Sequence, residues 1–483
     1  MRKGFIRKIK PLKILTKEQV EAIHRGTLDI LERTGVRFED EEALRFLENS
    51  GCYVDYKEKR VRFPSYLVEE CIRKCPSSFY IKARDPKDDM RIGGNTLYFM
   101  SFAGLRTCDL YTGETRIPTL AENDEAVRIS DALENLDCFP SYTPYFEIEG
   151  VEPCMLCPIS TASRIRNSTK ISRSAQVADA PIWDIKMAKA VGMQMLGNME
   201  ASPPLTYSED ATKAAFKFGE VGFPVFIAGG GIMGATAPAT IAGATISNNA
   251  EMLAAVVMLQ LIRPGIGIVA NDFVFPMNMR SGGPRFGSLE SALHQIIFNQ
   301  IWHEYYGIPT VNAAAGASNS KLADYQNGYE KMFVALTAAL SGANIIALHG
   351  GVTAELSYHP IQAILDDDIA GLVGRTIEGV EVTTETMAIE LINEVGPIPG
   401  HFLNKAHTRE WWKKEHFIPK VADMLSYPEW LKKGKKTALE YAKERMKEIL
   451  DTHKPTPLSE EQDKEIDRIL KEAREYYKKK GML

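Results

Sequence analysis

The sequence predicts an α/β protein built on a (β/α)8 TIM barrel, with an N-terminal α+β segment and a C-terminal helical extension. The main observation is a set of short apolar cores at near-regular intervals, each followed by a polar or glycine-rich loop and a helical pattern. These cores span residues 224–228, 266–270, 309–313 and 344–348. Short apolar runs that alternate with helices are typical of βα units sharing a buried parallel sheet. The loops after the strands form the active site of such a barrel, so the function is expected there.

Composition limits the class of protein. The chain has 483 residues, of which 45% are hydrophobic, which is enough for a large core. Its net charge of −5 and the lack of a concentrated basic face argue against nucleic acid as a partner. Because no run of about 18 apolar residues occurs, we expect no transmembrane helix and no membrane partner. The basic residues 1–10 lack the apolar core of a signal peptide, so a cytoplasmic protein is expected.

The N-terminal segment, residues 1–118, has the rhythm of an α+β unit. A helix is expected over residues 16–34, because Thr16 can cap it and Gln19 follows three residues later, as in a capping box. Further helices and short strands are expected over residues 41–49, 53–55, 60–64, 78–83, 95–100 and 107–111.

The barrel is assigned to residues 119–400, where strand and helix patterns alternate. Three strand candidates precede the four cores, at residues 138–146, 170–174 and 204–207. These make seven strands, and the pattern shows no eighth. No Gly-x-Gly-x-x-Gly motif follows the first strand, which weakens a dinucleotide-binding fold and favours the barrel.

Residues 401–483 are predicted to form a charged helical extension. Pro455 and Pro457 divide its Lys/Glu-rich part into two helices. Each helix has apolar residues at helical spacing, and this face can cap the barrel or contact another subunit. We expect a homo-oligomer.

The seven cysteines indicate neither a disulfide framework nor a metal site. Their number is odd and they are dispersed in a large chain. Cys154 and Cys157 form a single Cys-x-x-Cys pair, but no second pair of ligands follows. We therefore interpret them as buried thiols and expect no metal bound by this chain.

A glycine-rich loop follows the first of the four cores. It contains Gly229, Gly230, Gly231 and Gly234, between a strand and a helix. Such a loop can hold a phosphate, although no Gly-Lys-Ser/Thr follows it. The alternative is that the missing side chains give clearance for a bulky cofactor at the barrel mouth.

Charged and polar residues near the strand ends are candidates for the site. The long loop after the second core carries Arg280 and Arg285, and Glu290 begins the next helix. Glu290 either serves the site or complements the helix dipole. His349 directly follows a strand core and Asn312 lies late in another, so both are expected at the mouth. We take His349 and Glu290 as the catalytic candidates.

Aromatic residues gather in two places. The first cluster is Tyr98, Phe99 and Phe102, and the second is Tyr142, Tyr145 and Phe146. Each is either ordinary core or a cage for a quaternary ammonium ion, held by cation–π contacts worth roughly 0.5–2 kcal/mol each.

Several segments together resemble the trimethylamine methyltransferase superfamily. They are residues 31–36, 109–116, 281–287, 320–330 and 342–346. The resemblance extends from about Leu15 to the C-terminal helices. It implies a (β/α)8 barrel that transfers a methyl group from a methylated amine to the cobalt of a corrinoid (cobalamin) carried by a separate small protein.

The resemblance also implies a substrate class. Trimethylamine members carry pyrrolysine in the barrel, whereas this sequence is written in the twenty standard residues. It is similar to members without pyrrolysine that demethylate quaternary amines such as glycine betaine, proline betaine and carnitine. A quaternary ammonium is already charged, so Co(I) can attack its methyl group directly, and the protein needs only to orient it and exclude water. The glycines would then give clearance for the corrinoid, the aromatic clusters would hold the cation, and Arg280, Arg285, Asn312 and His349 would meet the substrate carboxylate.

Two alternatives remain open. A barrel lyase that forms a Schiff base would use Lys321, which lies eight residues beyond the third core. A non-catalytic betaine-binding protein would bind the same ligands without methylating cobalt.

Overall fold

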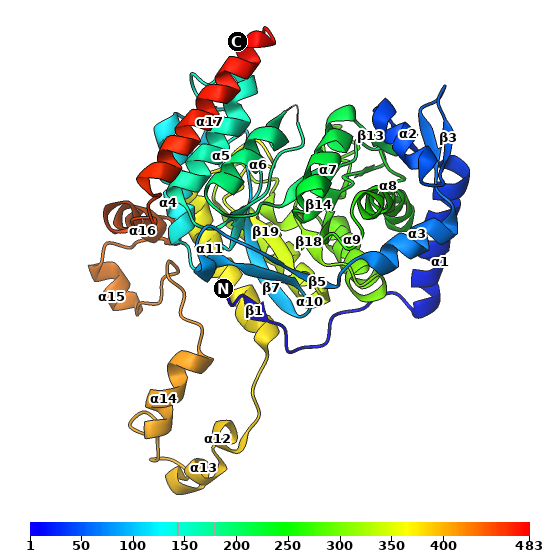
Figure 1. Cartoon of the computed structure of the whole chain (residues 1–483). Helices are drawn as coiled ribbons and strands as arrows, with labels where there is room; N and C mark the ends of the chain where they lie inside the picture. Colours follow the sequence, from blue (N-terminus) through cyan, green and yellow to red (C-terminus); the bar gives the residue numbers. More distant parts are fainter. Residues whose placement is uncertain (143, 178) are drawn as a thin grey trace.

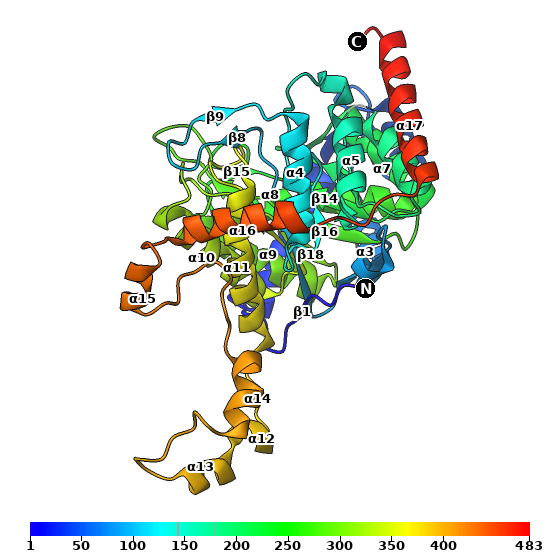
Figure 2. The same ribbon diagram turned by 90° about the vertical axis from the view of Figure 1, so that its left-hand side faces the viewer.

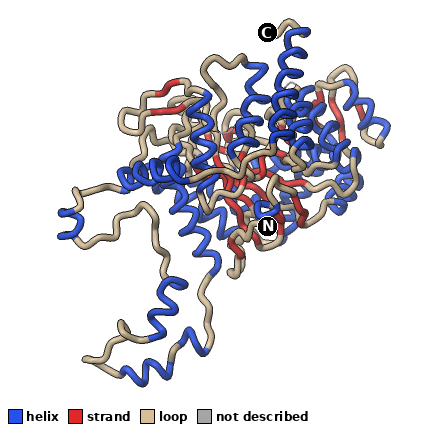
Figure 3. The backbone as a smooth tube through the Cα atoms, turned by 60° about the vertical axis from the view of Figure 1, so that its left-hand side comes forward, coloured by secondary structure: helices blue, strands red, loops and turns tan. Residues whose placement is uncertain are grey.

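The computed structural model describes residues 1–483 with the exception of Thr143 and Ala178. Its centre is a barrel of eight parallel strands surrounded by helices (Figures 1 and 3). The strands are β7 (Thr96–Ser101), β10 (Cys138–Phe139), β11 (Ile171–Ser172), β12 (Gly197–Glu200), β14 (Val225–Ala228), β16 (Ile268–Asp272), β18 (Thr310–Asn312) and β19 (Ile345–His349). They neighbour one another in chain order, and β19 pairs back with β7. A parallel bridge between Arg173 and Leu196 joins β11 to β12, which closes the barrel and confirms the predicted fold class.

A helix follows each barrel strand. These helices are α4 (Leu120–Ala132), α5 (Leu156–Asn167), α6 (Ala180–Ala190), α7 (Glu209–Val221), α8 (Ile241–Ile262), α9 (Leu289–Asn299), α10 (Tyr325–Ser341) and α11 (Pro360–Glu378). Side-chain oxygens of Ser208, Thr240 and Asp324 accept hydrogen bonds from backbone N–H groups at the starts of α7, α8 and α10. Gly222 and Gly342 end α7 and α10 in the left-handed conformation that favours glycine.

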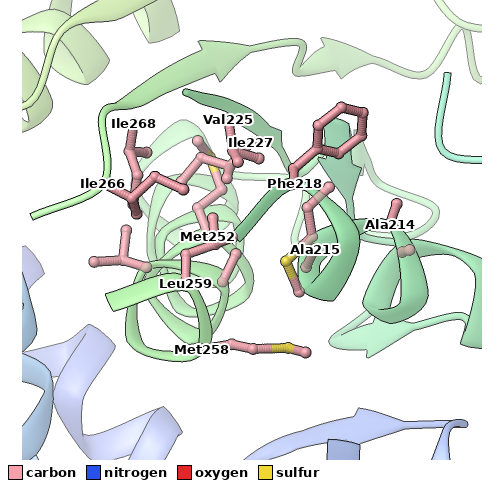
Figure 4. Packing of buried hydrophobic residues seen from close by; sticks show 14 of the residues in the cluster. Ala214, Ala215, Phe218, Val225, Ile227, Met252, Met258, Leu259, Ile266 and Ile268 are labelled. Atoms are coloured by element: carbon pink, nitrogen blue, oxygen red, sulfur yellow. The ribbon is translucent and has the colours of Figure 1, made fainter. Parts of the chain in front are cut away.

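The packing between the barrel and α8 shows which strand residues face outward. Val225 and Ile227 of β14 point toward the helix layer, where Leu259 of α8 contacts the same cluster (Figure 4). Burial stabilises each such side chain by roughly 1.5–3 kcal/mol. Because successive strand residues point to opposite faces, Phe226 and Ala228 face the barrel interior.

The long apolar helix α8 belongs to this core. By length and composition it could cross a membrane, but 78% of its apolar window is buried inside the protein. Two helices of the N-terminal segment, α1 (Lys17–Asp29) and α3 (Ser65–Lys74), pack against it. Because α8 is covered by the barrel on one side and by these two helices on the other, it needs no polar outer face.

The predicted N-terminal elements are present. Thr16 and Gln19 form the expected capping box at the start of α1, and a π-helical turn continues this helix over Ile30–Thr34. The other elements are β1 (Phe5–Ile6), β2 (Val36–Phe38), α2 (Glu41–Asn49), β3 (Tyr53–Asp55), β4 (Arg60–Arg62), β5 (Ser78–Ile81) and β6 (Met90–Gly93).

The structure corrects the expected positions of two barrel strands. Residues 204–207 do not belong to the barrel, because β13 (Thr206–Tyr207) pairs with β2 of the N-terminal segment. The fourth barrel strand is β12. The strand that the sequence pattern did not reveal is β7, which is the first barrel strand along the chain. It lies inside the range 1–118 assigned to the N-terminal segment, so the barrel begins before residue 119.

The two ends of the barrel differ. The hairpin of β5 and β6 covers the N-terminal ends of the strands, where Phe79 packs on Gly267 just before β16. The C-terminal ends form the mouth, which is surrounded by loops. These loops include β8 (Thr107–Cys108), β9 (Thr115–Arg116), β15 (Ile232–Met233) and β17 (Phe275–Pro276), with β8, β9 and β15 labelled above the barrel in Figure 2.

The C-terminal extension contains the two predicted long helices. They are α16 (Ala438–Thr452), which packs on α11 and α4, and α17 (Glu460–Lys479), which packs on α5 and α6. Pro455 and Pro457 lie between them. Between α11 and α15 (Tyr427–Lys432), residues 379–420 form an arm that extends away from the barrel and includes the expected boundary at residue 400 (Figures 1 and 2).

Candidate active site at the barrel mouth

A cavity of about 290 Å³ opens at the mouth, inside the ring of strands. Residues in or directly after all eight barrel strands line it. Its lining includes Met100, Ser101, Phe102, Pro140, Ser141, Tyr142, Phe146, Arg173, Gln176, Asn198, Glu200, Phe226, Ala228, Gly229, Asn271, Phe273, Ala313, Ala347 and Glu355. This position is where barrel enzymes place their substrates.

Strand register arranges the lining in two layers. Asn198 of β12 pairs with Phe226 of β14, and these two side chains form the deeper layer. Glu200 pairs with Ala228, which in turn pairs with Asn271 of β16, so these residues lie one layer closer to the mouth. The carbonyl oxygens of both asparagine side chains have no hydrogen-bond partner in the described part of the chain. Each of these two oxygens can therefore accept a hydrogen bond from a ligand that enters the cavity.

Arg173 and Glu200 form an ion pair inside the cavity. Their closest N–O distance is 2.7 Å, and Arg173 also donates a hydrogen bond of 3.2 Å to Ser141. The guanidinium lies 4.1 Å from the centre of the Phe226 ring. The side-chain amide oxygen of Gln176 accepts a 2.5 Å hydrogen bond from the Glu200 backbone N–H. Arg173 Nε has no partner in the described part of the chain, so the guanidinium keeps one free donor.

A second carboxyl group, Glu355, lies at the rim of the cavity. It follows β19 in a mouth loop and also borders an open groove beside the cavity. Burial raises the pKa of Glu355, and the negative charge of Glu200 raises it further. The lining thus holds two carboxyl groups and one guanidinium, so its net charge is negative when both carboxyl groups are ionised, and a cationic ligand would stabilise that charged form of Glu355.

Aromatic side chains surround the upper part of the cavity. The rings of Tyr142 and Phe146 are 4.8 Å apart, and Phe102 and Phe273 line the same space. Tyr142 has a φ of 56°, a left-handed conformation that is uncommon for a tyrosine. Burial raises the pKa of Tyr142, with Cys157 as a further contributor, so its hydroxyl is neutral. Neutral aromatic faces with nearby carboxylates suit a quaternary ammonium group.

Gly229 separates the cavity from two polar residues of α8. A Cβ atom at Gly229 would lie 2.1 Å from Asn248 Oδ1 and 2.9 Å from Glu251 Oε2. Glu251 accepts a 2.9 Å hydrogen bond from the Leu205 backbone N–H through its other oxygen. Burial raises the pKa of Glu251 to about 7. The missing side chain at Gly229 thus lets a protonatable carboxyl group approach the cavity wall.

The other glycines of this loop do not line the cavity. Gly230 and Gly234 have φ values of 118° and 91°, so the turn itself requires glycine there, and Gly231 lies against Ala237. Strand β15 lies between Gly231 and Gly234, and a turn separates Gly234 from the first residue of α8, Ile241. The loop therefore does not lead directly into a helix N-terminus, as a phosphate-binding loop would.

Four predicted site residues meet at the cavity. They are Phe102, Tyr142, Phe146 and Gly229. The other three aromatic candidates lie elsewhere, and the structure corrects their expected position. The Tyr98 hydroxyl lies 3.4 Å from the backbone oxygen of Arg2, at the end of the barrel opposite the mouth.

The two remaining aromatics pack outside the barrel interior. Phe99 contacts Phe5 edge to face, between β7 and β1. Tyr145 packs edge to face on Tyr358, in a separate apolar cluster beneath α11. Both side chains therefore belong to the core, as the alternative interpretation of each cluster allowed.

His349 and Asn312 also face away from the cavity, contrary to expectation. His349 is fully buried between β19 and α11, with Nε2 3.5 Å from Asp367 Oδ1. Asn312 is fully buried against α9, where its side-chain oxygen accepts a 3.0 Å hydrogen bond from Asn299. Neither side chain can contact a ligand in the cavity.

The charged candidates of the long loop lie outside the cavity as well. Arg280 is exposed. Arg285 lines the open groove beside the cavity and lies 3.7 Å from Glu290, which starts α9. Lys321 borders the same groove and is exposed, so it does not occupy the strand position typical of a Schiff-base lysine.

The predicted site residues do not include the charged and asparagine side chains of the cavity. These are Arg173, Asn198, Glu200, Asn271 and Glu355. Arg173 and Asn271 lie in segments that were correctly placed at strand ends, so position alone could have identified them. Asn198 and Glu200 were not predicted as site residues because the sequence pattern did not identify β12 as a barrel strand. In the described part of the chain, no group of three metal-ligating side chains occurs.

Comparisons with known proteins agree with this fold. The chain matches the family model described as trimethylamine methyltransferase (MTTB) over residues 2–476. Glycine betaine methyltransferase of Desulfitobacterium hafniense (strain Y51) is 30% identical over 475 residues, covering 95% of this chain and 96% of that protein. Trimethylamine methyltransferase MttB of Desulfitobacterium hafniense (strain DSM 10664 / DCB-2) is 29% identical over 481 residues, covering 95% and 94%.

A solved structure shares the fold. The monomethylamine methyltransferase MtmB of Methanosarcina barkeri superposes with a TM-score of 0.51 at 13% identity, covering 96% of this chain and 88% of that one. At this identity the likeness concerns the fold alone. The family model, in contrast, spans nearly the whole sequence, with the cavity inside the matched range. The chain is therefore a methyltransferase that belongs to the trimethylamine methyltransferase (MTTB) family.

Proposed function

We propose that this protein transfers a methyl group from a betaine-type quaternary amine to the Co(I) of a corrinoid held by a partner protein. Glycine betaine, proline betaine and carnitine are representative substrates. The observation that carries this proposal is the polarity of the cavity, which has amide and guanidinium donors among its deeper residues and aromatic rings with a carboxyl group near the rim. A betaine has the same division, with a carboxylate at one end and an ammonium at the other.

This polarity supports one orientation of the substrate. The methyl acceptor must enter from the mouth, so the ammonium group lies uppermost, against Phe102, Tyr142 and Phe146. The carboxylate then lies deeper, where Arg173 Nε and the side-chain N–H group of Asn198 are the donors that would meet it. The ion pair with Glu200 holds the guanidinium in place for this contact.

The proposed reaction needs little acid–base chemistry from the protein. The methyl group leaves the ammonium nitrogen without its bonding electrons, and the product is a neutral tertiary amine. The barrel contributes by holding one methyl group toward the mouth and by excluding water from it. This assignment gives no catalytic role to His349 or Glu290, and it requires neither a bound metal nor pyrrolysine in this chain.

The rim of the mouth offers a docking surface for the corrinoid-binding partner. Several large apolar residues in the loops and helix starts around the mouth are exposed by 40% or more, among them Val177, Met279, Leu289, Tyr325 and Leu356. Exposed apolar residues of this kind are typical of protein contact sites. A partner bound there would close the cavity from solvent during transfer, in keeping with an enzyme of the cytoplasm.

The test is a substrate panel. The purified protein is mixed with a reduced corrinoid-binding protein, or free cob(I)alamin, and with a series of quaternary and tertiary amines. Methylcobalamin formation is followed by its absorption spectrum. The proposal requires conversion with at least one quaternary amine. Conversion with trimethylamine alone, or with no amine, would refute it.

A further inference from the structure

Cys154 and Cys157 form a pair at the start of α5 that the proposed reaction does not use. Both are free thiols. A 3₁₀ turn over Pro153–Met155 leads directly into the helix at Leu156, so the two cysteines are about one helical turn apart. Cα atoms three residues apart are about 5 Å apart in an α-helix and about 6 Å apart in a 3₁₀-helix. Both values lie within the range of roughly 4.4–6.8 Å that a disulfide spans, so the backbone allows a bond between these residues.

Both cysteines lie close to the C-terminal helix α17, which packs on α5 and α6 (Figure 1). Burial raises the pKa of Tyr477 on this helix, and negative charge at Asp179, Cys157 and Cys154 raises it further. Cys154 Sγ also donates a 3.6 Å hydrogen bond to the backbone oxygen of Met482, near the end of the chain. Both cysteine side chains therefore approach the same hydroxyl group, which places the two sulfur atoms on the same side of α5.

The two thiols differ in exposure. Cys154 is only half-buried, unlike the buried thiol expected from the sequence, whereas Cys157 is 8% exposed. Burial raises the pKa of Cys157 to about 12. Because the thiolate is the form that attacks a disulfide bond, Cys157 does not react first with a molecule in solution. A partly exposed cysteine followed by a buried one at a helix start suits a redox-active pair, in which the outer sulfur reacts first and the inner one closes the disulfide.

Cys157 also contacts the wall of the cavity. Tyr142, which lines the cavity, packs in a small cluster with Cys157, Ala175 and Ala180. Burial raises the pKa of Tyr142, and the Cys157 sulfur raises it further through its charge and through a hydrogen bond with the tyrosine hydroxyl. A disulfide would turn this sulfur toward Cys154 and remove the thiol from Tyr142. The redox state of the pair is thereby coupled to the cavity wall.

We propose that Cys154 and Cys157 are a redox-active dithiol that closes to a disulfide and thereby changes the cavity wall at Tyr142. The oxidant is a low-molecular-weight disulfide such as oxidised glutathione. The Cys154 thiolate attacks one of its sulfur atoms and releases one thiol, and Cys157 then loses its proton and attacks Cys154, which releases the second thiol. In total the two cysteines lose two electrons and two protons, and the oxidant becomes two thiols. Formation of the disulfide is independent of the proposed function, whereas its effect on amine binding rests on that function.

The first test detects the disulfide by mass spectrometry in the full-length protein. The protein is equilibrated without oxygen in mixtures of reduced and oxidised glutathione, free thiols are blocked, and the linked peptides are sequenced. The wild type should form the bond between Cys154 and Cys157 reversibly, and so should the control Cys71→Ser, which changes a buried thiol of α3.

Two variants separate the steps of this reaction. Cys157→Ser should hold one glutathione on Cys154, because no second sulfur displaces it. Cys154→Ser should hold none on Cys157, because the buried thiol does not react first. Circular dichroism checks that each variant is folded. Absence of the bond in the folded wild type, or a folded Cys157→Ser variant that takes up no glutathione, would overturn the proposal.

The second test measures the coupling to Tyr142. Tyr142→Phe removes only the hydroxyl, and with it the hydrogen bond that favours the dithiol form. The equilibrium constant for disulfide formation against glutathione should therefore rise about 2- to 12-fold, which is the net effect of one neutral hydrogen bond. The control Tyr145→Phe, whose ring packs outside the barrel interior, should leave the constant unchanged. An unchanged constant in Tyr142→Phe would show that the pair is not coupled to the cavity through this residue.

The same equilibrium distinguishes this proposal from the proposed function. A quaternary amine that binds better to the dithiol form must shift the equilibrium toward the dithiol by the ratio of its two affinities. Saturating glycine betaine should lower the constant for disulfide formation about 2- to 30-fold, which is the range of one cation–π contact. If Tyr142→Phe raises the constant but glycine betaine, proline betaine and carnitine all leave it unchanged, the coupled dithiol is supported and the proposed substrate class is contradicted.

Discussion

Replacing Arg173 tests the proposed contact between this residue and the substrate carboxylate inside the cavity. Its removal alone would leave Glu200 without its cation, so both residues are changed together in Arg173→Gln/Glu200→Gln. This variant keeps the shape of the pair and removes both charges. A hydrogen bond to a charged group contributes about 1.5–3 kcal/mol, which corresponds to a loss of about 10- to 150-fold in affinity for glycine betaine.

The comparison substrate for this variant is choline, which has the same trimethylammonium group with a hydroxyl in place of the carboxylate. Loss of attraction between Glu200 and the ammonium group would weaken both ligands alike. The ratio of the two dissociation constants, measured by calorimetry, therefore reports the carboxylate contact. We expect the preference for glycine betaine over choline to fall by about 10-fold or more. An unchanged ratio would mean that Arg173 does not bind the carboxylate, even if the enzyme were less active.

Three further predictions concern the cavity wall. Gly229→Ala places a methyl group 2.1 Å from Asn248 Oδ1 and should lower the free energy of unfolding in urea by about 1–3 kcal/mol, whereas an unchanged midpoint would contradict this close contact. The pKa of Glu251, about 7 in the folded protein, lies above its ordinary value of 4.5, so stability should fall as pH rises through this window. The difference in free energy of unfolding between Glu251→Gln and wild type should therefore shift by up to about 3 kcal/mol in favour of the variant as the pH rises from below 4.5 to above 7. If the stability of both proteins depended on pH in the same way, this prediction would be wrong. Phe102→Ala should raise KM for quaternary amines about 2- to 30-fold through the lost cation–π contact, while Tyr98→Phe, at the far end of the barrel, should not.

The parallel sheet could be predicted largely because of its buried central strands. The cores around Phe226, Val269, Val311 and Ile346 are continuous apolar runs, as expected for strands covered on both faces. In β12 the inward residues include Asn198 and Glu200, which line the cavity. The polar side chains that line the cavity interrupt the apolar pattern of the strand, so β12 was harder to recognise than the continuous apolar strands.

Strand β7 was predicted as a strand but assigned to the N-terminal segment, for a different reason. Its sequence, from Thr96 to Ser101, is apolar and was expected to be a strand. It follows the antiparallel hairpin of β5 and β6, and β1 pairs antiparallel with its first residues. Its local surroundings therefore resemble an α+β unit. Only the non-local pairing with β19 and β10 makes it a barrel strand, and such pairing leaves no mark in the local sequence.

Side-chain direction decided which of the predicted site residues line the cavity. In β18, Val311 belongs to the inner apolar cluster and Ala313 lines the cavity. Asn312, between them, must point outward, since a shift of one residue moves a side chain to the other face of the sheet. This misplacement could have been avoided from the sequence, because Val311 and Ala313 are the apolar members of an alternating pattern.

His349 could not have been placed by the same argument. Ala347 lines the cavity, so simple alternation puts the residue two positions later on the same inward face. A β-bulge lies between them, because Ala347 pairs with Met100 while His349 pairs with the next residue, Ser101. The additional residue, Leu348, reverses the alternation and turns the imidazole outward toward α11. Since Leu348 is as apolar as a regular strand residue, the sequence carries no sign of this bulge, and a histidine at the end of a barrel strand remains a misleading candidate until the pairing of that strand is known.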